Sequence, residues 1–124
     1  MPIYNTATTA AALGVSPKWL DNLLSHNDIH GVDTESQGVA RRLPLAAVNI
    51  LALAMDLIDD LAIPAPAALR LASRILSANG GELVVSSGIR LSVDLQALHS
   101  RVLEQLARAV ETAPTPRRGR PPKR

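Results

Sequence analysis

Apolar residues recur along this chain at spacings of three and four, which are typical of helices that bury one face. Residues 17–26 carry leucines at this spacing, and residues 44–61 are apolar nearly all round, which predicts a buried central helix. Residues 94–111 carry a single apolar stripe: Leu95, Leu98, Val102, Leu106 and Val110. The pattern therefore predicts a mainly α fold.

Caps and helix breakers divide the first part of the chain into separate elements. Thr6 is a suitable N-cap for a helix over 7–13, and Gly14 is placed to end that helix. Ser16 is the next expected N-cap, with Pro17 at the first helical position. The sequence thus predicts two helices joined by a tight turn.

Small β-hairpins and one further helix are expected in the rest of the chain. Apolar pieces at 29–32 and 38–43 surround a polar centre flanked by glycines, which predicts a first hairpin. A helix near Pro66 is expected to end at 79–81. The alternation in "ELVVSSGIRLSVD" predicts a second hairpin that turns at 87–88.

Composition narrows the class of protein. The 124 residues allow one domain plus an appendage, and the absence of Phe means that aliphatic side chains fill the core. Without cysteine the chain has no disulfide, thiolate metal site or cysteine nucleophile. The start lacks signal-peptide features, and the longest uncharged apolar stretch, 43–55, is shorter than the ~20 residues that span a bilayer. We expect a soluble, cytoplasmic protein.

Positive charge gathers at the C-terminal end. Of the 13 Lys and Arg residues, five lie in 114–124, so residues 1–113 hold eight bases against 11 acids and carry a net charge of −3. Four prolines share this end with the five bases, and no acid does. We therefore expect a tail that is disordered alone and that binds a polyanion independently of the body.

The segment "TTAAALGVSPKWL" places a small residue, a turn glycine and hydrophobic contacts where a helix-turn-helix needs them: Ala10, Gly14, Val15, Leu20 and Leu23. Together with "GVARRLP" and "LPLAAVNILALAMDLIDDLAIPAPAALRLA", it resembles the MerR-like and excisionase-like winged helix-turn-helix DNA-binding domains over roughly residues 3–78. The resemblance implies a winged helix-turn-helix with small β-hairpins, followed by a hairpin and a C-terminal dimerisation helix. It also implies double-stranded DNA as the partner.

By this resemblance, the second helix would lie in the major groove with its N-terminal residues at base edges. The implied DNA-facing positions are Ser16, Pro17, Lys18, Asp21, Asn22 and Ser25. Lys18 can meet phosphate or guanine, and Asn22 can form two hydrogen bonds with adenine. Arg41 and Arg42 would emerge from the wing toward the backbone or a minor groove. Recognition helices of this kind usually carry arginines, so a single lysine beside Asp21 predicts modest sequence readout by the body alone.

The tail "PRRGRPPKR" resembles an AT-hook, whose Arg-Gly-Arg-Pro core stands here as Arg118, Gly119, Arg120 and Pro121. Proline keeps the backbone extended and glycine lets it lie on the groove floor, so that the arginines reach along a narrow A·T minor groove. The remaining tail cations would contact phosphates: Arg117, Lys123 and Arg124. The alternatives are a generic solubilising or polyanion-binding tail and a nuclear-localisation signal.

The last helix lies outside the resemblance. In MerR-like proteins a C-terminal helix pairs with its copy, and we expect a homodimer through the stripe formed by Leu95, Leu98, Val102, Leu106 and Val110. The alternative is that this stripe folds back on the helix at 45–61. The expected organisation is a winged helix-turn-helix domain over 1–81, a hairpin and dimerisation helix over 82–113, and a disordered AT-hook-like basic tail over 114–124.

The expected function is DNA binding by a bacterial transcriptional regulator or a nucleoid-associated protein, with no catalysis, cofactor or metal. His26 and His30 straddle a predicted helix end without further ligands, and "NGGE" lacks the lysine of a phosphate-binding loop. The alternative is a protein-binding adaptor or antitoxin-like partner, in which the helix at 45–61 meets a second protein and the basic tail is non-specific.

Overall fold

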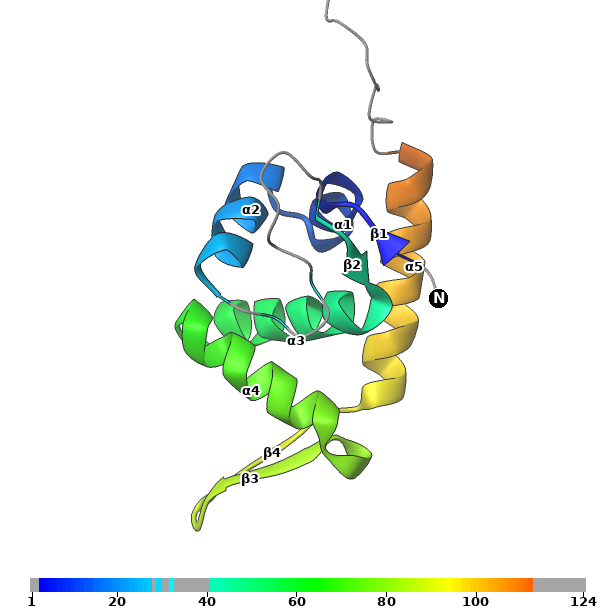
Figure 1. Cartoon of the computed structure of the whole chain (residues 1–124). Helices are drawn as coiled ribbons and strands as arrows, with labels where there is room; N and C mark the ends of the chain where they lie inside the picture. Colours follow the sequence, from blue (N-terminus) through cyan, green and yellow to red (C-terminus); the bar gives the residue numbers. More distant parts are fainter. Residues whose placement is uncertain (1–2, 28, 30–31, 33–40, 113–124) are drawn as a thin grey trace, which may run out of the picture.

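The computed structural model describes residues 3–27, 29, 32 and 41–112, and Figure 1 shows how they are arranged. Five α-helices and two small antiparallel sheets, each of two strands, make up this described part. The predicted mainly α class is therefore confirmed. None of the described helices is long and apolar enough to cross a membrane.

Two helices joined by a short turn form the N-terminal part. α1 (Thr6–Leu13) is capped by Asn5, whose Oδ1 accepts a backbone N–H of the first turn at 2.7 Å. The expectation that Thr6 caps this helix is wrong by one residue, because Asn5 keeps extended backbone angles while Thr6 already lies in the first turn. Gly14 ends α1 as predicted, with a φ of 75° that glycine adopts without a Cβ clash. α2 (Pro17–His26) follows.

The first small sheet joins two segments that are far apart in the sequence. β1 (Ile3–Tyr4) pairs antiparallel with β2 (Leu43–Pro44). The predicted hairpin between 29–32 and 38–43 falls largely outside the described residues, and Leu43 pairs with Tyr4 of β1. The hairpin stays a prediction, and β1 is an additional partner that the sequence did not predict, because a local pattern identifies an extended segment but not the distant strand that it meets.

α3 (Leu45–Leu61) is the central helix that the sequence predicts, and α4 (Ala65–Ser77) packs against it. Its buried residues include several alanines, which let neighbouring helices approach closely: Ala47, Val48, Ile50, Leu51, Ala52, Leu53, Ala54 and Leu57. Most of the apolar surface of α3 is therefore covered by the chain itself, while the adaptor alternative, which assigns this helix to a second protein, stays a prediction.

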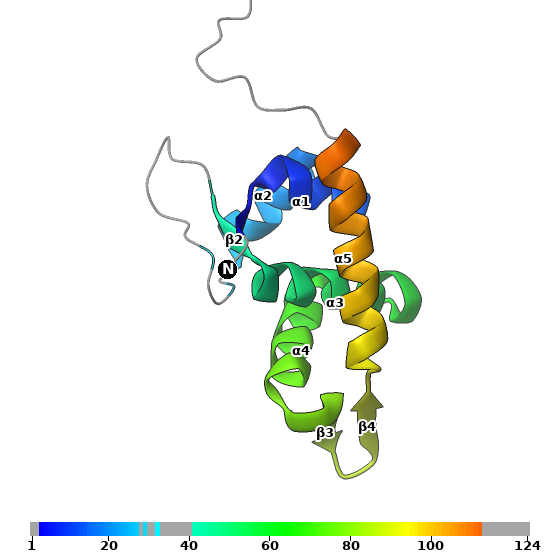
Figure 2. The same ribbon diagram turned by 90° about the vertical axis from the view of Figure 1, so that its right-hand side faces the viewer.

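A second hairpin projects from the body beyond the C-terminal end of α4 (Figures 1 and 2). β3 (Glu82–Ser86) pairs antiparallel with β4 (Ile89–Ser92) through the predicted turn at 87–88. A short 3-10 turn, η1 (Asn79–Gly81), leads into β3, and its last residue has a φ of 73°. A Cβ at that glycine would lie 2.5 Å from the carbonyl oxygen of Val93, so this tight entry to the hairpin requires glycine.

α5 (Leu95–Thr112) returns along the molecule and packs across α3 and α1, as Figure 2 shows. Three residues of its apolar stripe, Leu98, Val102 and Leu106, belong to the same hydrophobic core as these two helices, and Val102 and Leu106 are only 1% and 2% exposed. The stripe therefore folds back on the chain's own body, which is the alternative that the sequence leaves open.

This packing corrects the assignment of Leu98, Val102 and Leu106 to a dimer interface. The three side chains are buried within a single chain, because α1 and α3 supply the cover that a second copy was expected to supply. Leu95 is half-buried, and Val110 is 61% exposed. Self-pairing of the protein stays a prediction, and it would need a surface other than the three buried side chains.

Candidate nucleic-acid interface

The exposed side of α2 is the surface on which the predicted DNA contacts lie. Ser16 caps the helix as predicted, because its Oγ accepts the backbone N–H of Trp19 at 3.0 Å, and Pro17 occupies the first helical position. Leu20 and Leu24 turn the other side of α2 into the core. This burial sets the rotation of α2 about its axis and leaves a polar side in solvent.

Three of the predicted contact residues, Ser16, Lys18 and Asn22, are exposed. Lys18 and Asn22 are one turn apart, so their side chains start about 6 Å from each other on one side of α2. The Oγ of Ser16 uses a lone pair in the helix cap and keeps its own O–H proton for donation. The structure thus brings these residues together at one accessible surface, while their contact with DNA stays a prediction.

Arg41 does not emerge into solvent as predicted. Its Nη1 donates to the carboxylate of Asp21, and its Nη2 donates to the Oγ of Ser25 at 2.9 Å. The side chain of Arg41 is only 17% exposed. The predicted orientation is wrong because a carboxylate and a hydroxyl on α2 offer this guanidinium charge-assisted hydrogen bonds within one chain. We call this set of three residues the Arg41 clamp.

The Arg41 clamp changes the charge that α2 presents. Because Asp21 and Arg41 neutralise each other, Lys18 is left as the exposed cation of α2. Within the described residues, the Nε of Arg41 is buried and has no hydrogen-bond partner. Arg42 is exposed beside the clamp, so its contact with DNA stays a prediction. No spacing rule could have revealed the clamp, since its ion pair joins residues 20 positions apart.

Other predicted contacts lie outside the described residues. These are the tail residues Arg117, Arg118, Gly119, Arg120, Pro121, Lys123 and Arg124; most of the predicted wing also lies outside the described residues, as does His30. Trp19, which is expected to lie half-buried between α2 and the wing, is 38% exposed. Over the described ranges, no group of three or more His, Asp or Glu side chains could hold a metal ion.

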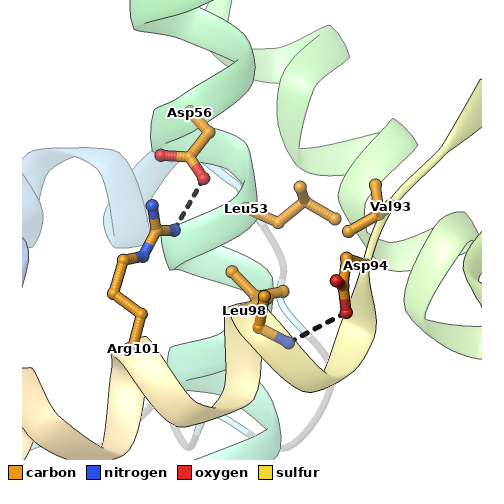
Figure 3. Close-up of a pocket in the computed structure, with 7 residues that line it drawn as sticks. Leu53, Asp56, Val93, Asp94, Leu98 and Arg101 are labelled. Atoms are coloured by element: carbon orange, nitrogen blue, oxygen red, sulfur yellow. Dashed lines mark hydrogen bonds and ion pairs between the residues drawn. The ribbon is translucent and has the colours of Figure 1, made fainter.

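A cleft of about 250 Å³ lies where α5 begins beside α3 (Figure 3). Its charged groups already have partners: Arg101 donates to Asp56 at 2.6 Å, and Asp94 caps α5 by accepting the backbone N–H of Ala97 at 3.0 Å. The first interaction attaches α5 to α3, and the second caps α5 itself. We therefore interpret the cleft as a joint between helices and not as a binding site.

Comparisons with protein-family models, with curated proteins and with solved structures found no match for this chain. Its function must therefore be argued from the polar side of α2, from the Arg41 clamp and from the sequence of the tail.

Proposed function

We propose that this chain binds double-stranded DNA through a winged helix-turn-helix, as a bacterial transcriptional regulator or a nucleoid-associated protein. The observation that carries the proposal is the exposed polar side of α2, opposite the buried Leu20 and Leu24. A helix with its side chains is about 10–12 Å across, and the major groove is about 12 Å wide. α2 enters this groove with Lys18 and Asn22 toward the base edges.

The position of α5 supports a second contact through the tail. The C-terminal end of α5, after which residues 113–124 follow in the sequence, lies beside α1 in both views, on the side of the body that carries the two N-terminal helices (Figures 1 and 2). Fully extended, these residues would reach about 40 Å. This length lets Arg118 and Arg120 enter an A·T minor groove while α2 occupies the adjoining major groove.

The tail contribution can be tested with two variants of equal charge. Arg118→Gln with Arg120→Gln changes the Arg-Gly-Arg-Pro core, whereas Arg117→Gln with Lys123→Gln removes two positive charges outside it. Affinity is measured by fluorescence anisotropy on A·T-rich and G·C-rich duplexes. We expect only the core variant to lose the preference for A·T-rich duplex. An equal effect of both variants would identify a generic basic tail.

The contribution of α2 needs a separate control. Lys18→Ala with Asn22→Ala should weaken binding to a preferred duplex about tenfold, because a base or phosphate contact is worth ~1–3 kcal/mol. Arg90→Ala removes one positive charge from the hairpin, which lies at the far end of the molecule from α2 (Figure 1), and should change binding less than about twofold. Unchanged affinity in the α2 variant would reject the major-groove role of this helix.

A further inference from the structure

A groove of about 460 Å³ lies between the C-terminal end of α2 and α4, and we call it the α2–α4 groove. His26 and Asn27 line it from the α2 side, and Arg70, Ser73 and Arg74 line it from α4. Among the described residues, no carboxylate lines this groove. Its polar groups are therefore dominated by hydrogen-bond donors and positive charge.

The two arginines of the groove differ from most others in the described chain. Four arginines, at positions 41, 90, 101 and 108, each form an ion pair with a carboxylate. Arg70 and Arg74 are exposed and have no such partner within the described residues. They stand one helical turn apart on α4, where like charges repel. An anion between them would remove this repulsion.

The other side chains of the groove suit the oxygens of a phosphate group. Ser73 has an O–H, and each guanidinium has five N–H donors in a planar arrangement that matches phosphate oxygens. On the opposite wall, Nδ1 of His26 donates to the carbonyl oxygen of Asn22 at 2.8 Å, because a carbonyl can only accept. Its Nε2 is therefore the ring nitrogen left for a ligand. Asn27 donates one amide N–H to the carbonyl oxygen of Leu23 at 3.0 Å, which leaves its second amide N–H for a ligand.

The groove continues the polar side of α2. Lys18, Asn22 and His26 follow one another at four-residue intervals and so lie along one side of the helix. From Lys18 to His26 the helix rises about 12 Å, which corresponds to three or four base pairs along a duplex. A DNA strand bordering the bases that α2 reads would therefore pass the α2–α4 groove.

We propose that the α2–α4 groove binds a phosphate group, with Arg70 and Arg74 as its principal ligands. In the protein–DNA complex this group is a backbone phosphate beside the bases that α2 reads, an assignment that rests on the proposed function. A free phosphate ion has the same binding chemistry, so the test has to separate the two sources.

The first arm uses the full chain and two variants that each remove two positive charges. Arg70→Gln with Arg74→Gln changes the groove, and Arg90→Gln with Arg108→Gln is the matched control on the hairpin and α5. Affinity for an A·T-rich duplex is measured at about 50 mM and about 200 mM salt. We expect the groove variant to bind about tenfold more weakly, with a salt slope lower by about 1, and the control to change less than about twofold. Equal losses and equal slopes in the two variants would overturn the proposal.

Folding is controlled by circular dichroism, and Arg70→Lys with Arg74→Lys provides a second variant that keeps both charges. The lysine variant should recover part of the duplex affinity and most of the salt slope, because lysine still contacts phosphate as a point charge. If the lysine variant binds no better than the glutamine variant although both are folded, the phosphate assignment is wrong.

The second arm titrates the ¹⁵N-labelled full chain with inorganic phosphate and follows its NMR resonances. Saturable shifts at His26 and Asn27, absent in the glutamine variant, would show that the groove accepts free phosphate. If phosphate causes no such shifts but the glutamine variant loses duplex affinity selectively, the ligand is a phosphate of the DNA strand. If the wild-type chain binds no duplex, the proposed function is wrong. The assignment of the groove as a phosphate site is then kept only if the titration with inorganic phosphate is saturable. If the chain neither binds duplex nor shows saturable shifts with phosphate, the phosphate assignment of the groove is wrong as well.

Discussion

Leu106→Ala separates the two roles that the apolar stripe of α5 could have. In the structure this side chain is 2% exposed, in the core that α5 shares with α1 and α3. Leu103 lies on the same helix but is 43% exposed, so Leu103→Ala makes the same chemical change at a position that leaves no enclosed cavity. Both variants keep a good helix former in α5, which excludes helix propensity as the cause of any difference.

The expected loss of stability in Leu106→Ala follows from the burial of this side chain. Removing a buried leucine side chain costs about 2–5 kcal/mol, which includes the cavity that remains. Total stabilities of domains are about 5–15 kcal/mol, so a loss near ~3 kcal/mol is a large share. In a domain of this size it lowers the midpoint of thermal unfolding by roughly 10–15 °C. Leu103→Ala should cost less than about 1 kcal/mol, because much of the side chain is in water before the change.

Urea unfolding followed by circular dichroism, at two protein concentrations about tenfold apart, provides the assay. Intramolecular packing predicts that the unfolding midpoint of the wild type does not depend on concentration and that Leu106→Ala lowers it at both. Equal losses in the two variants would contradict the burial of Leu106 within one chain. A wild-type midpoint that rises with concentration, together with loss of that rise in Leu106→Ala, would show instead that the stripe joins two copies.

Three further changes test separate parts of the structure. Gly81→Ala should lower the free energy of unfolding by ~3 kcal/mol, because a Cβ at this position meets the backbone. Gly80→Ala is the control: its φ is similar but the space around it is open, so it should cost only ~1 kcal/mol. Similar losses of the two variants in a thermal melt would contradict this steric account. Asp21→Asn should tighten duplex binding about threefold or more, because it releases Arg41 and removes a negative charge. Weaker binding of this variant in a duplex titration would show that the clamp does not keep Arg41 from DNA. Ser16→Ala should destabilise the fold by ~1 kcal/mol in urea unfolding, and no loss would mean that its hydroxyl does not cap α2.

Most of the candidate interface on α2 could be predicted, because it depends on neighbouring residues. Ser16 and Pro17 identify the start of the helix, and the leucines opposite Lys18 identify its buried side. The α2–α4 groove was missed. The four-residue spacing of Arg70 and Arg74 was visible, but nothing in the sequence placed them opposite the end of α2.

By itself the sequence determined, to within a residue or two, where the helices begin and end, together with the glycine turns and the hairpin at 82–92. These features depend on capping bonds, backbone sterics and side-chain periodicity within a few residues. Only the tertiary structure decided that β1 is the partner of β2, that α1 and α3 cover α5, and that Arg41 turns to Asp21. An apolar stripe or a guanidinium is satisfied equally well by its own chain or by another molecule, and the choice depends on which distant segment the fold brings within reach.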